Sequence, residues 1–539
     1  MNSMVALYII SMGIFAAGAY FALIKQLHMA QLEGYKQGQY WRWLKRNINI
    51  SFFREFIILV LTASLAAVCY LTKYRIVWIY IYFLIWCGAN AYLVIKLKDK
   101  TESKKPLVFT HRAIRLLAAN VFFLALWSLL SYIYAENIVT FVLLLTFLRF
   151  LLPFNMLVSM TVIYPLEMLI HYRYFRQAQM KISGMKDLKV IGITGSYGKT
   201  STKYFLHTIL SEKYNTLMTP ESYNTPMGIT KVIREQLNKD YDVFICEMGA
   251  RNIGDIKLLC RLVNPAIGIL TSIGPQHLET FKTIENVAKT KYELIQALPY
   301  YGTAVFNGDN SYCLSLARKT GIETLIYSIK NDDEDVYIRA EDIVSSREGL
   351  RFKVRTQDGI DFECRTKLLG KHNVSNMLAA ISTALRLGLS PDEIKRGISN
   401  IKPVPHRLQI LDTNNGVMVI DDAFNSNPVG ARDALETIKE FTDGDRIIVT
   451  PGMVELGSIE YEENRKFGKI MAECCDYAIL VGVKRSKPII KGLKQGNFPE
   501  DRIIITTSLN EASSKLGSIV KPGDTVLFEN DLPDNYDEM

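Results

Sequence analysis

The chain has 539 residues, 22% of them charged and 49% hydrophobic, and a formal net charge of +9. This length predicts several domains. Residues 1–185 hold 19 Lys and Arg against 6 Asp and Glu, a net charge of +13, which leaves −4 for residues 186–539. Because the basic residues flank the most apolar third, they indicate membrane topology and not nucleic-acid binding. The eight cysteines include no C-x-x-C pair, which is typical of free thiols in a reducing cytosol.

The first third contains apolar segments long enough to cross a hydrocarbon core of about 30 Å, which takes about 20 helical residues. There are five, at about 4–24, 52–72, 76–95, 113–134 and 138–160. The first lacks the charged start and small-residue cleavage site of a signal peptide. We therefore expect residues 1–170 to form a transmembrane domain of about five helices, followed by a juxtamembrane connector over 171–186 that lies along the membrane surface.

Charge in the connecting loops predicts the orientation of these spans. Basic residues are concentrated in loops 25–50 and 96–112, whereas the 135–137 turn carries only Glu136 and the N-terminus carries no charged side chain. The positive-inside rule places both basic loops in the cytoplasm and the N-terminus outside. Five crossings then deliver everything after residue 171 to the cytoplasm. Arg149 lies inside the fifth span near Pro153, either as a functional residue or as an arginine that faces the bundle near a kink.

From Leu188 onward, short apolar strands alternate with helical stretches, which predicts an α/β parallel sheet. Candidate strands fall at 188–193, 214–218, 242–247, 266–272, 303–306 and 323–327. Alternation over 334–368 predicts a small antiparallel insertion. Two prolines at 402–405 indicate a linker. A second α/β unit follows, with strands near 416–421, 446–450, 477–481, 502–505 and 525–528.

The segment 190–203, VIGITGSYGKTSTK, joins an apolar strand to a glycine loop and then to a helix start. That arrangement suits a nucleotide phosphate site, because glycines let backbone N–H groups approach phosphates, a lysine reaches the terminal ones and a hydroxyl binds Mg²⁺. The spacing departs from the common G-x-x-x-x-G-K-[ST]. The residues concerned are Gly195, Ser196, Gly198, Lys199, Thr200 and Ser201.

Further polar residues follow the predicted strands. Glu247 ends a buried strand, where a carboxylate can hold Mg²⁺. His277 can bind a second metal or cap a helix, and Lys291 is either a carbamate-forming lysine or part of a solvated helix face. Asn373 and Asn376, one helical turn apart, can read an adenine edge or cap the helix.

The order of these segments resembles the Mur ligase family, the ATP-dependent amide-bond ligases of cell-wall precursor synthesis, and most closely its D-alanyl-D-alanine-adding branch. The matching segments are TGSYGKTS, EMGARNIGDI, SIGPQHLE, AKTKYE, GKHNVSNMLAA, PHRL, DDAFNSNP and MVELG, over about residues 187–460. The resemblance implies a fold of three parts: an α-helical transmembrane bundle, an α/β P-loop central domain over 187–405 and an α/β Rossmann-like C-terminal domain over 406–539.

The resemblance also implies roles for individual residues. Lys199 and its loop bind ATP phosphates, Thr200 and Glu247 hold one Mg²⁺, and His277 with a carbamylated Lys291 positions a second. The remaining expected contacts are Asn224 near the γ-phosphate and acceptor carboxylate, Asn376 with Asn373 at the adenine, and Arg407 and Asp422 closing onto the nucleotide from the C-terminal domain.

Two departures from the family bear on the substrate. The five predicted spans stand where a Mur ligase has its UDP-sugar-binding domain, and the chain ends FENDLPDNYDEM in place of a basic, glycine-containing ending. We expect a ligase in the bacterial cytoplasmic membrane that joins a lipid-linked or other membrane-associated carboxylate to an amino acid or peptide amine. The alternatives are a ligase adding D-alanyl-D-alanine to a UDP-linked peptide, and a membrane transport or signalling ATPase.

Overall fold

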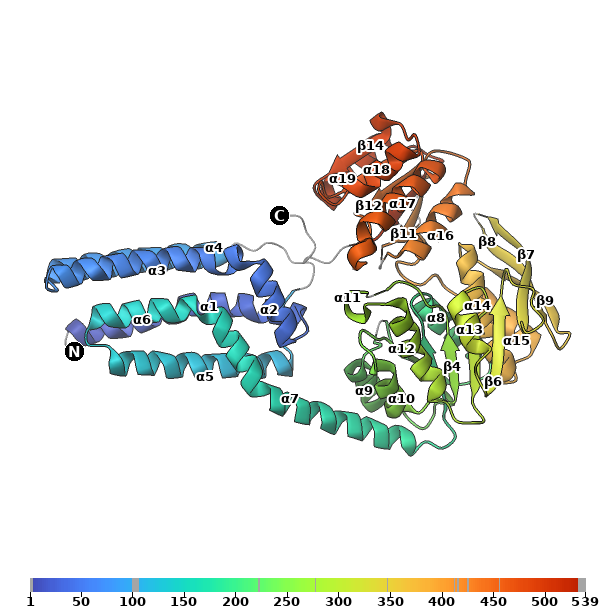
Figure 1. Cartoon of the computed structure of the whole chain (residues 1–539), viewed down its shortest axis with the longest axis horizontal. Helices are drawn as coiled ribbons and strands as arrows, with labels where there is room; N and C mark the ends of the chain where they lie inside the picture. Colours follow the sequence, from blue (N-terminus) through green and yellow to red (C-terminus); the bar gives the residue numbers. More distant parts are fainter. Residues whose placement is uncertain are drawn as a thin grey trace. The chain divides into compact units, whose positions relative to one another are not determined.

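The computed structural model describes residues 3–98, 106–221, 223–276, 278–346, 348–411, 413, 416–423, 426–454 and 456–531. The chain forms two compact units, Met1–Tyr172 and Arg173–Met539. The described part of the first unit is helical, and the second unit holds both β-sheets (Figure 1).

The first unit is a bundle of apolar helices. They are α1 (Ser3–Leu32), α2 (Gln37–Arg46), α3 (Ile48–Leu71), α4 (Ile76–Lys98), α5 (His111–Tyr134), α6 (Ile138–Phe150) and the start of α7 (Leu152–Ser183). Four stretches of the described helices are long and apolar enough to span a membrane: Val5–Leu32, Phe52–Leu71, His111–Tyr134 and Leu152–Ser183. Helix α6 packs against α1, α3 and α5 through buried Phe141, Val142 and Leu145.

The prediction of one continuous span over 138–160 is wrong, because α6 ends at Phe150 and α7 begins at Leu152. Pro153 explains the interruption: it has no N–H to donate within a running helix, but it is tolerated in the first turn of a new one. Helix α6 has 13 residues, too few for a span of its own, whereas α4 has 23, so the predicted span over 76–95 stays a prediction. Most of the predicted connector over 171–186 belongs to α7, which continues through Pro165 to Ser183, and its position along a membrane surface stays a prediction.

The first sheet of the second unit has nine strands in the order β2-β3-β1-β4-β5-β6-β7-β8-β9. The strands are β1 (Lys189–Thr194), β2 (Thr216–Met218), β3 (Val243–Glu247), β4 (Ile267–Leu270), β5 (Thr303–Asn307), β6 (Glu323–Ser328), β7 (Ile338–Ser346), β8 (Gly349–Thr356) and β9 (Asp361–Thr366). Pairing is parallel from β2 to β7 and antiparallel from β7 to β9. The predicted antiparallel insertion therefore extends the same sheet, because Tyr327 of β6 pairs with Ile338 of β7.

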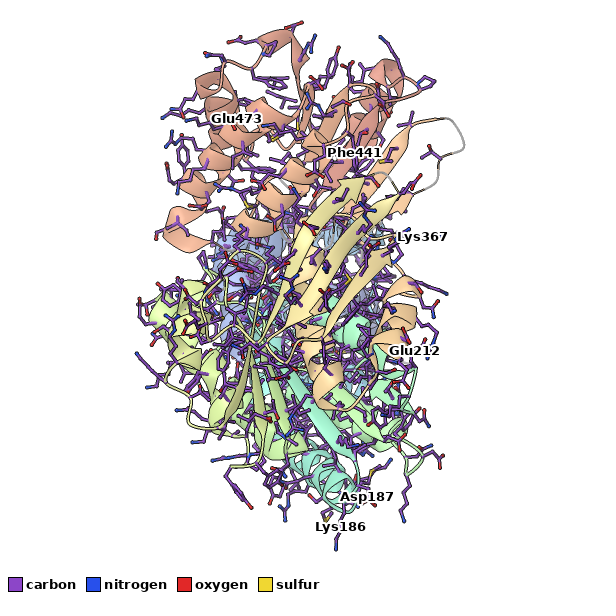
Figure 2. All side chains as sticks on the ribbon, turned by 90° about the vertical axis from the view of Figure 1, so that its right-hand side faces the viewer. Lys186, Asp187, Glu212, Lys367, Phe441 and Glu473 are labelled. Carbon is purple, nitrogen blue, oxygen red and sulfur yellow. The ribbon has the colours of Figure 1, made fainter. Side chains whose placement is uncertain are left out.

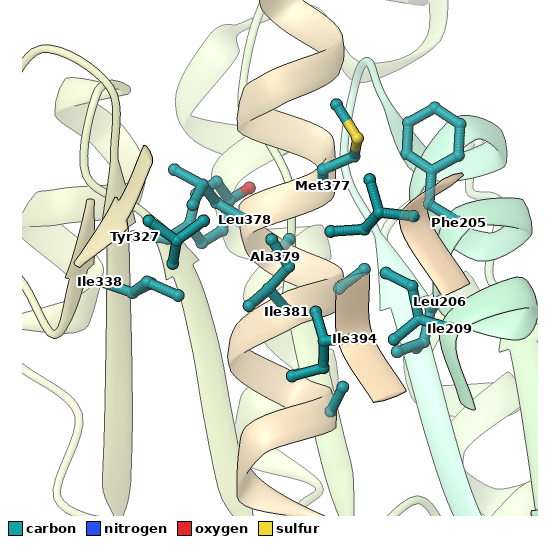
Figure 3. Packing of buried hydrophobic residues seen from close by; sticks show 14 of the residues in the cluster. Phe205, Leu206, Ile209, Tyr327, Ile338, Met377, Leu378, Ala379, Ile381 and Ile394 are labelled. Carbon is teal, nitrogen blue, oxygen red and sulfur yellow. The ribbon is translucent and has the colours of Figure 1, made fainter. Parts of the chain in front are cut away.

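Helices cover both faces of this sheet. They are α8 (Lys199–Leu210), α9 (Pro226–Glu235), α10 (Asp255–Val263), α11 (Leu278–Phe281), α12 (Ile284–Gln296), α13 (Ser311–Ala317), α14 (Lys371–Arg386) and α15 (Pro391–Ser399). Figure 3 shows α14 beside α8, with Met377 and Ile381 in the same buried cluster as Phe205 and Ile209. Helices α9, α10 and α12 belong to a second buried cluster. This packing fixes α8, and with it the loop that precedes α8.

The C-terminal sheet has six strands in the order β10-β11-β15-β12-β13-β14, parallel except for β10. Its elements are β10 (Gln409–Leu411), β11 (Met418–Asp422), α16 (Pro428–Lys439), β12 (Arg446–Thr450), α17 (Glu460–Cys474), β13 (Tyr477–Val481), α18 (Lys487–Gln495), β14 (Ile503–Thr506), α19 (Leu509–Ile519) and β15 (Thr525–Glu529). Short 3₁₀ turns cover Gly457–Ile459 and Glu500–Arg502. In Figure 2, Phe441 and Glu473 of this part lie at the opposite end of the second unit from Lys186 and Asp187.

Candidate functional site

The glycine loop follows β1, an interior strand in the parallel part of the nine-stranded sheet. Strand β1 pairs with β3 on one side and β4 on the other, and residues 195–198 join its carboxyl end to the first turn of α8. Gly198 has φ +80°, and a Cβ there would overlap the Asn376 side chain. A Cβ at Gly195 would overlap Thr271 Oγ1. The loop therefore requires glycine at both positions.

The segment after β4 holds the glycine loop in place. The backbone N–H of Ser196 donates to Ser272 O at 2.7 Å, and that of Tyr197 donates to Ser272 Oγ at 2.9 Å. The Ser196 hydroxyl donates to Gly274 O and accepts from Gly274 N, at 3.1 and 3.0 Å. Ser196 thus supports the loop with its side chain, and its predicted role at the nucleotide remains a prediction.

Two lysines converge on one backbone carbonyl of this loop. Lys199 Nζ donates to Gly195 O at 2.6 Å, and Lys291 Nζ from α12 donates to the same oxygen at 2.8 Å. Burial lowers the pKa of Lys199 to about 8, against the opposing charge of Glu247. Burial, reinforced by Lys199, lowers the pKa of Lys291 well below its ordinary value. Lys291 is therefore set up to lose its proton, as a nucleophilic or carbamate-forming lysine must.

Glu247 ends β3 beside the loop and is 1% exposed. Asn224 Nδ2 donates to its Oε1 at 3.0 Å, and Lys203 Nζ lies 3.2 Å from Oε2. Apart from this ion pair with Lys203, the buried Oε2 has no hydrogen-bond partner among the described residues. Such an oxygen suits Mg²⁺, which proteins commonly hold through one or two carboxylates together with substrate phosphates.

The other two predicted metal ligands besides Lys291 are Thr200 and His277. Thr200 is half-buried in the first turn of α8. His277 lies outside the described residues. Among the residues that the structure describes, no group of three or more His, Cys, Asp or Glu could hold a metal ion without further ligands. A cation at Glu247 would therefore take its remaining ligands from hydroxyl groups, water or phosphate oxygens.

Sequence reasoning missed Lys203, which is fully buried and also donates to the Glu221 carbonyl. The signal was present in GKTSTK, because Lys199 and Lys203 are four residues apart on α8 and share one face of the helix. Burial lowers the pKa of Lys203, while Glu247 opposes that shift. Lys203 thus supplies the cation that balances the buried Glu247 carboxylate.

A pocket that Gly198 helps to line lies between the nine-stranded sheet and the C-terminal domain. Its lining includes Ser201 and Asn376 from one side, Arg407 and Asp422 from the other, and His372, which sequence reasoning also missed. His372 Nδ1 lies 3.6 Å from the Asp433 carboxylate, so this pair bridges α14 and α16.

Asn373 does not line this pocket. Its Nδ2 donates to Leu369 O at 2.7 Å, and the side chain is buried. Of the two alternatives for this asparagine, a helix-start contact matches the geometry. Asn376 instead faces the glycine loop, where its Oδ1 accepts from Thr202 Oγ1 at 3.4 Å.

Arg407 and Asp422 enter from the C-terminal domain. The backbone N–H of Leu408 donates to Asp422 Oδ1 at 3.2 Å. Burial raises the pKa of Asp422 to about 7, although the nearby Arg407 favours its ionised form. Burial lowers the pKa of Arg407, and both Asp422 and Glu247 oppose this. The Arg407 charge therefore interacts with a carboxylate of the C-terminal domain, Asp422, and with one of the nine-stranded sheet, Glu247.

Comparison with known proteins places this site in a family. Residues 193–384 match the Mur ligase middle domain, and residues 406–529 match the Mur ligase glutamate ligase domain. UDP-N-acetylmuramoyl-tripeptide–D-alanyl-D-alanine ligases are similar in sequence. The Escherichia coli enzyme is 32% identical over 322 residues, 60% of this chain and 70% of that protein. The Bacillus subtilis enzyme is 28% identical over 342 residues, 63% of this chain and 72% of that protein.

Solved structures share the fold. MurF from Acinetobacter baumannii aligns with a TM-score of 0.61 at 24% identity, covering 68% of this chain and 78% of that one. MurF from Thermotoga maritima in complex with ADP aligns with a TM-score of 0.58 at 24% identity, covering 67% and 80%. Together with the two matched domains, these similarities show that the chain belongs to the Mur ligase family of ATP-dependent ligases that form C–N bonds.

Proposed function

We propose that this chain is a membrane-anchored ligase that activates a membrane-associated carboxylate with ATP and couples it to an amino acid or peptide amine. The observation that carries the proposal is the convergence of Lys199 and Lys291 on the Gly195 carbonyl, with Glu247 near enough to interact with Lys199. The described residues of the same chain include four helices long and apolar enough to span a membrane. On this proposal, the N-terminus lies outside and both sheets lie in the cytoplasm.

The site suits formation of an acyl phosphate. Attack of a carboxylate on the γ-phosphate of ATP brings two anions together, and cationic groups must neutralise their charge. Lys199 would contact the phosphates, and Asn224 would orient both Glu247 and the acceptor carboxylate. Mg²⁺ at Glu247 and Thr200 would supply further positive charge when bound. Lys291, with its pKa lowered, would take up CO₂ as a carbamate and, with His277, hold a second ion.

The second step needs protection from water, because an acyl phosphate hydrolyses readily. Arg407 and Asp422 line the pocket opposite Ser201 and Asn376, so movement of the C-terminal domain would open and close the nucleotide site. The amine would then displace phosphate from the acyl group and form the amide. In this order of steps, Arg407 and Asp422 would contact the nucleotide and Asn224 would contact the acceptor.

The test is phosphate and ADP release by the purified full chain, with product mass as the readout. Candidate acceptors are membrane lipid extracts and a soluble UDP-muramyl tripeptide, each supplied with amino acids or D-alanyl-D-alanine. Product from the lipid extract alone supports the proposal. Product from the UDP-linked peptide alone would instead assign the activity named for the curated relatives.

A matched pair of lysines on α12 separates a ligase from a membrane ATPase. Lys291 is buried and contacts Gly195, whereas Lys289, two residues earlier, is exposed. Lys291→Ala should abolish ligation and Lys289→Ala should preserve it. Full ATP turnover by Lys291→Ala, without need of bicarbonate, would contradict the ligase proposal.

A further inference from the structure

Strand β15 lies between β11 and β12 in the C-terminal sheet, and a glutamate at its carboxyl end connects all three strands. Glu529 is 1% exposed, and it is the partner of Asp422 in the parallel pairing of β15 with β11. Its Oε1 accepts from the hydroxyl of Ser426, which follows β11. Its Oε2 accepts from Thr450 Oγ1, at the end of β12, at 2.5 Å. One buried carboxylate therefore ties the loops at these strand ends together.

The next residue, Asn530, makes three more contacts at the same strand ends. Its backbone N–H donates to Asp422 O at 3.3 Å, its Oδ1 accepts from the backbone N–H of Ser426 at 3.3 Å, and its Nδ2 donates to Gly452 O at 2.6 Å. Asn530 has φ +64°, a left-handed conformation that asparagine adopts more readily than most residues. Ser426 is therefore held twice, through its hydroxyl by Glu529 and through its backbone by Asn530.

Glu529 and Asn530 are not among the described residues that line the pocket beside Gly198, but they contact residues that are. Asp422, Ser426 and Asn427 belong to the lining, together with the first turn of α16. Asn427 caps that helix, because its Oδ1 accepts from two backbone N–H groups of the first turn. Since Ser426 directly precedes the cap, holding Ser426 in place also fixes where the start of α16 meets the pocket.

The Glu529 carboxylate also acts on the charge of the pocket, because it is adjacent to Asp422 across two paired strands. Burial raises the pKa of Asp422 to about 7, and Arg407 opposes this shift. Glu529 adds to the shift, as does Asp421, which lies 2.7 Å from His406. Burial raises the pKa of Glu529 as well, but the two hydroxyl groups that donate to it favour its ionised form. The charge of Asp422 therefore depends on the charge of Glu529.

We propose that Glu529 and Asn530 are positioning residues for nucleotide binding, which hold Ser426 and Asp422 at the pocket and set the charge that Asp422 presents to the nucleotide. This inference rests on the proposed function, which assigns the nucleotide to this pocket. Both residues belong to the ending FENDLPDNYDEM, where the chain departs from the basic ending expected for the family. The inference thus gives the start of this acidic ending a role at the site.

Calorimetric titration of the detergent-solubilised full chain with ADP, at a fixed Mg²⁺ concentration and over about pH 5 to about pH 9, tests this role. Asn530→Gly keeps the left-handed backbone but loses both side-chain contacts, so it should raise the Kd for ADP about tenfold. Glu529→Gln keeps the shape of the side chain and loses its charge. The pH at which the ADP affinity changes should then fall by about one pH unit, because Asp422 ionises more readily. The phosphates of ADP titrate alike with every variant, so the difference between variants reports on the protein.

Glu473→Gln is the matched control, because Glu473 is an exposed glutamate on α17 of the same domain (Figure 2). It should change neither the Kd nor its pH dependence. A Kd for Asn530→Gly within about twofold of the wild type, or an unchanged pH dependence in Glu529→Gln, would overturn the proposal. Faster hydrogen exchange over Thr525–Glu529 in Glu529→Gln with an unchanged pH dependence would also overturn it, because the residue would then serve stability alone. Absence of ADP binding by the wild type would instead refute the nucleotide pocket itself, and the proposed function with it.

Discussion

Replacing Lys203 by methionine would leave the Glu247 carboxylate buried without its cation. The exposed fractions of the two side chains are 0% and 2%, and Nζ and Oε2 are 3.2 Å apart, so solvent screens neither group. Breaking a buried ion pair by removing one partner typically costs about 3–5 kcal/mol. We expect Lys203→Met to destabilise the nine-stranded sheet by about this amount. The Lys203→Met/Glu247→Gln double variant should recover most of the loss, because no charge is then left buried.

Hydrogen–deuterium exchange is the suitable assay, because all five tryptophans lie in residues 41–127 and fluorescence would report on the first unit alone. Peptides covering Val243–Glu247 report on β3 directly. A loss of about 3 kcal/mol should accelerate exchange there by about 100-fold. Added Mg²⁺ should slow exchange more in Lys203→Met than in the wild type, since a cation would replace the missing charge. Exchange within about threefold of the wild type would refute the ion-pair reasoning.

Three further predictions concern the nucleotide side of the site. Gly198→Ala should raise the KM for ATP and destabilise the fold by about 1–2 kcal/mol, since φ +80° and the Asn376 side chain both oppose a Cβ; an unchanged KM would contradict this. The pKa of Asp422 in the folded state is raised to about 7. Between about pH 4 and about pH 7 the unfolded chain therefore loses this proton while the folded chain keeps it, and the free energy of unfolding should fall as the pH rises through this range. Asp422→Asn should therefore stabilise the C-terminal domain above pH 7 and not at pH 4, as measured by exchange in β11 and β15 at both pH values. Lys199→Met should slow phosphate release at least about 100-fold. Lys213→Met is the control and should not slow it, because Lys213 lies just beyond the end of α8 and contacts Gly388 O.

The sequence predicted most of the local structure of the second unit. The strands beginning near residues 189, 243, 303 and 446 form where apolar runs indicated them, because short buried β-branched segments between turn residues have few alternatives. The break at Leu151 was missed. A 23-residue apolar run with one proline reads as a single span, and only the capping and packing of α6 decide where the helix stops.

What the sequence by itself determined is the order of motifs, and with it the family, since glycine loop, strand-end carboxylate and Lys291 occur in a fixed succession. The tertiary structure decided which of these groups touch. Lys199 and Lys291 are 92 residues apart yet share the Gly195 carbonyl, and Arg149 meets Glu55 and Asn90 from other helices. Sequence spacing carries no information on such contacts, because they depend on which strand ends and helix faces the packing brings together. The unsatisfied Nη2 of Arg149 exists only as a property of the packed bundle.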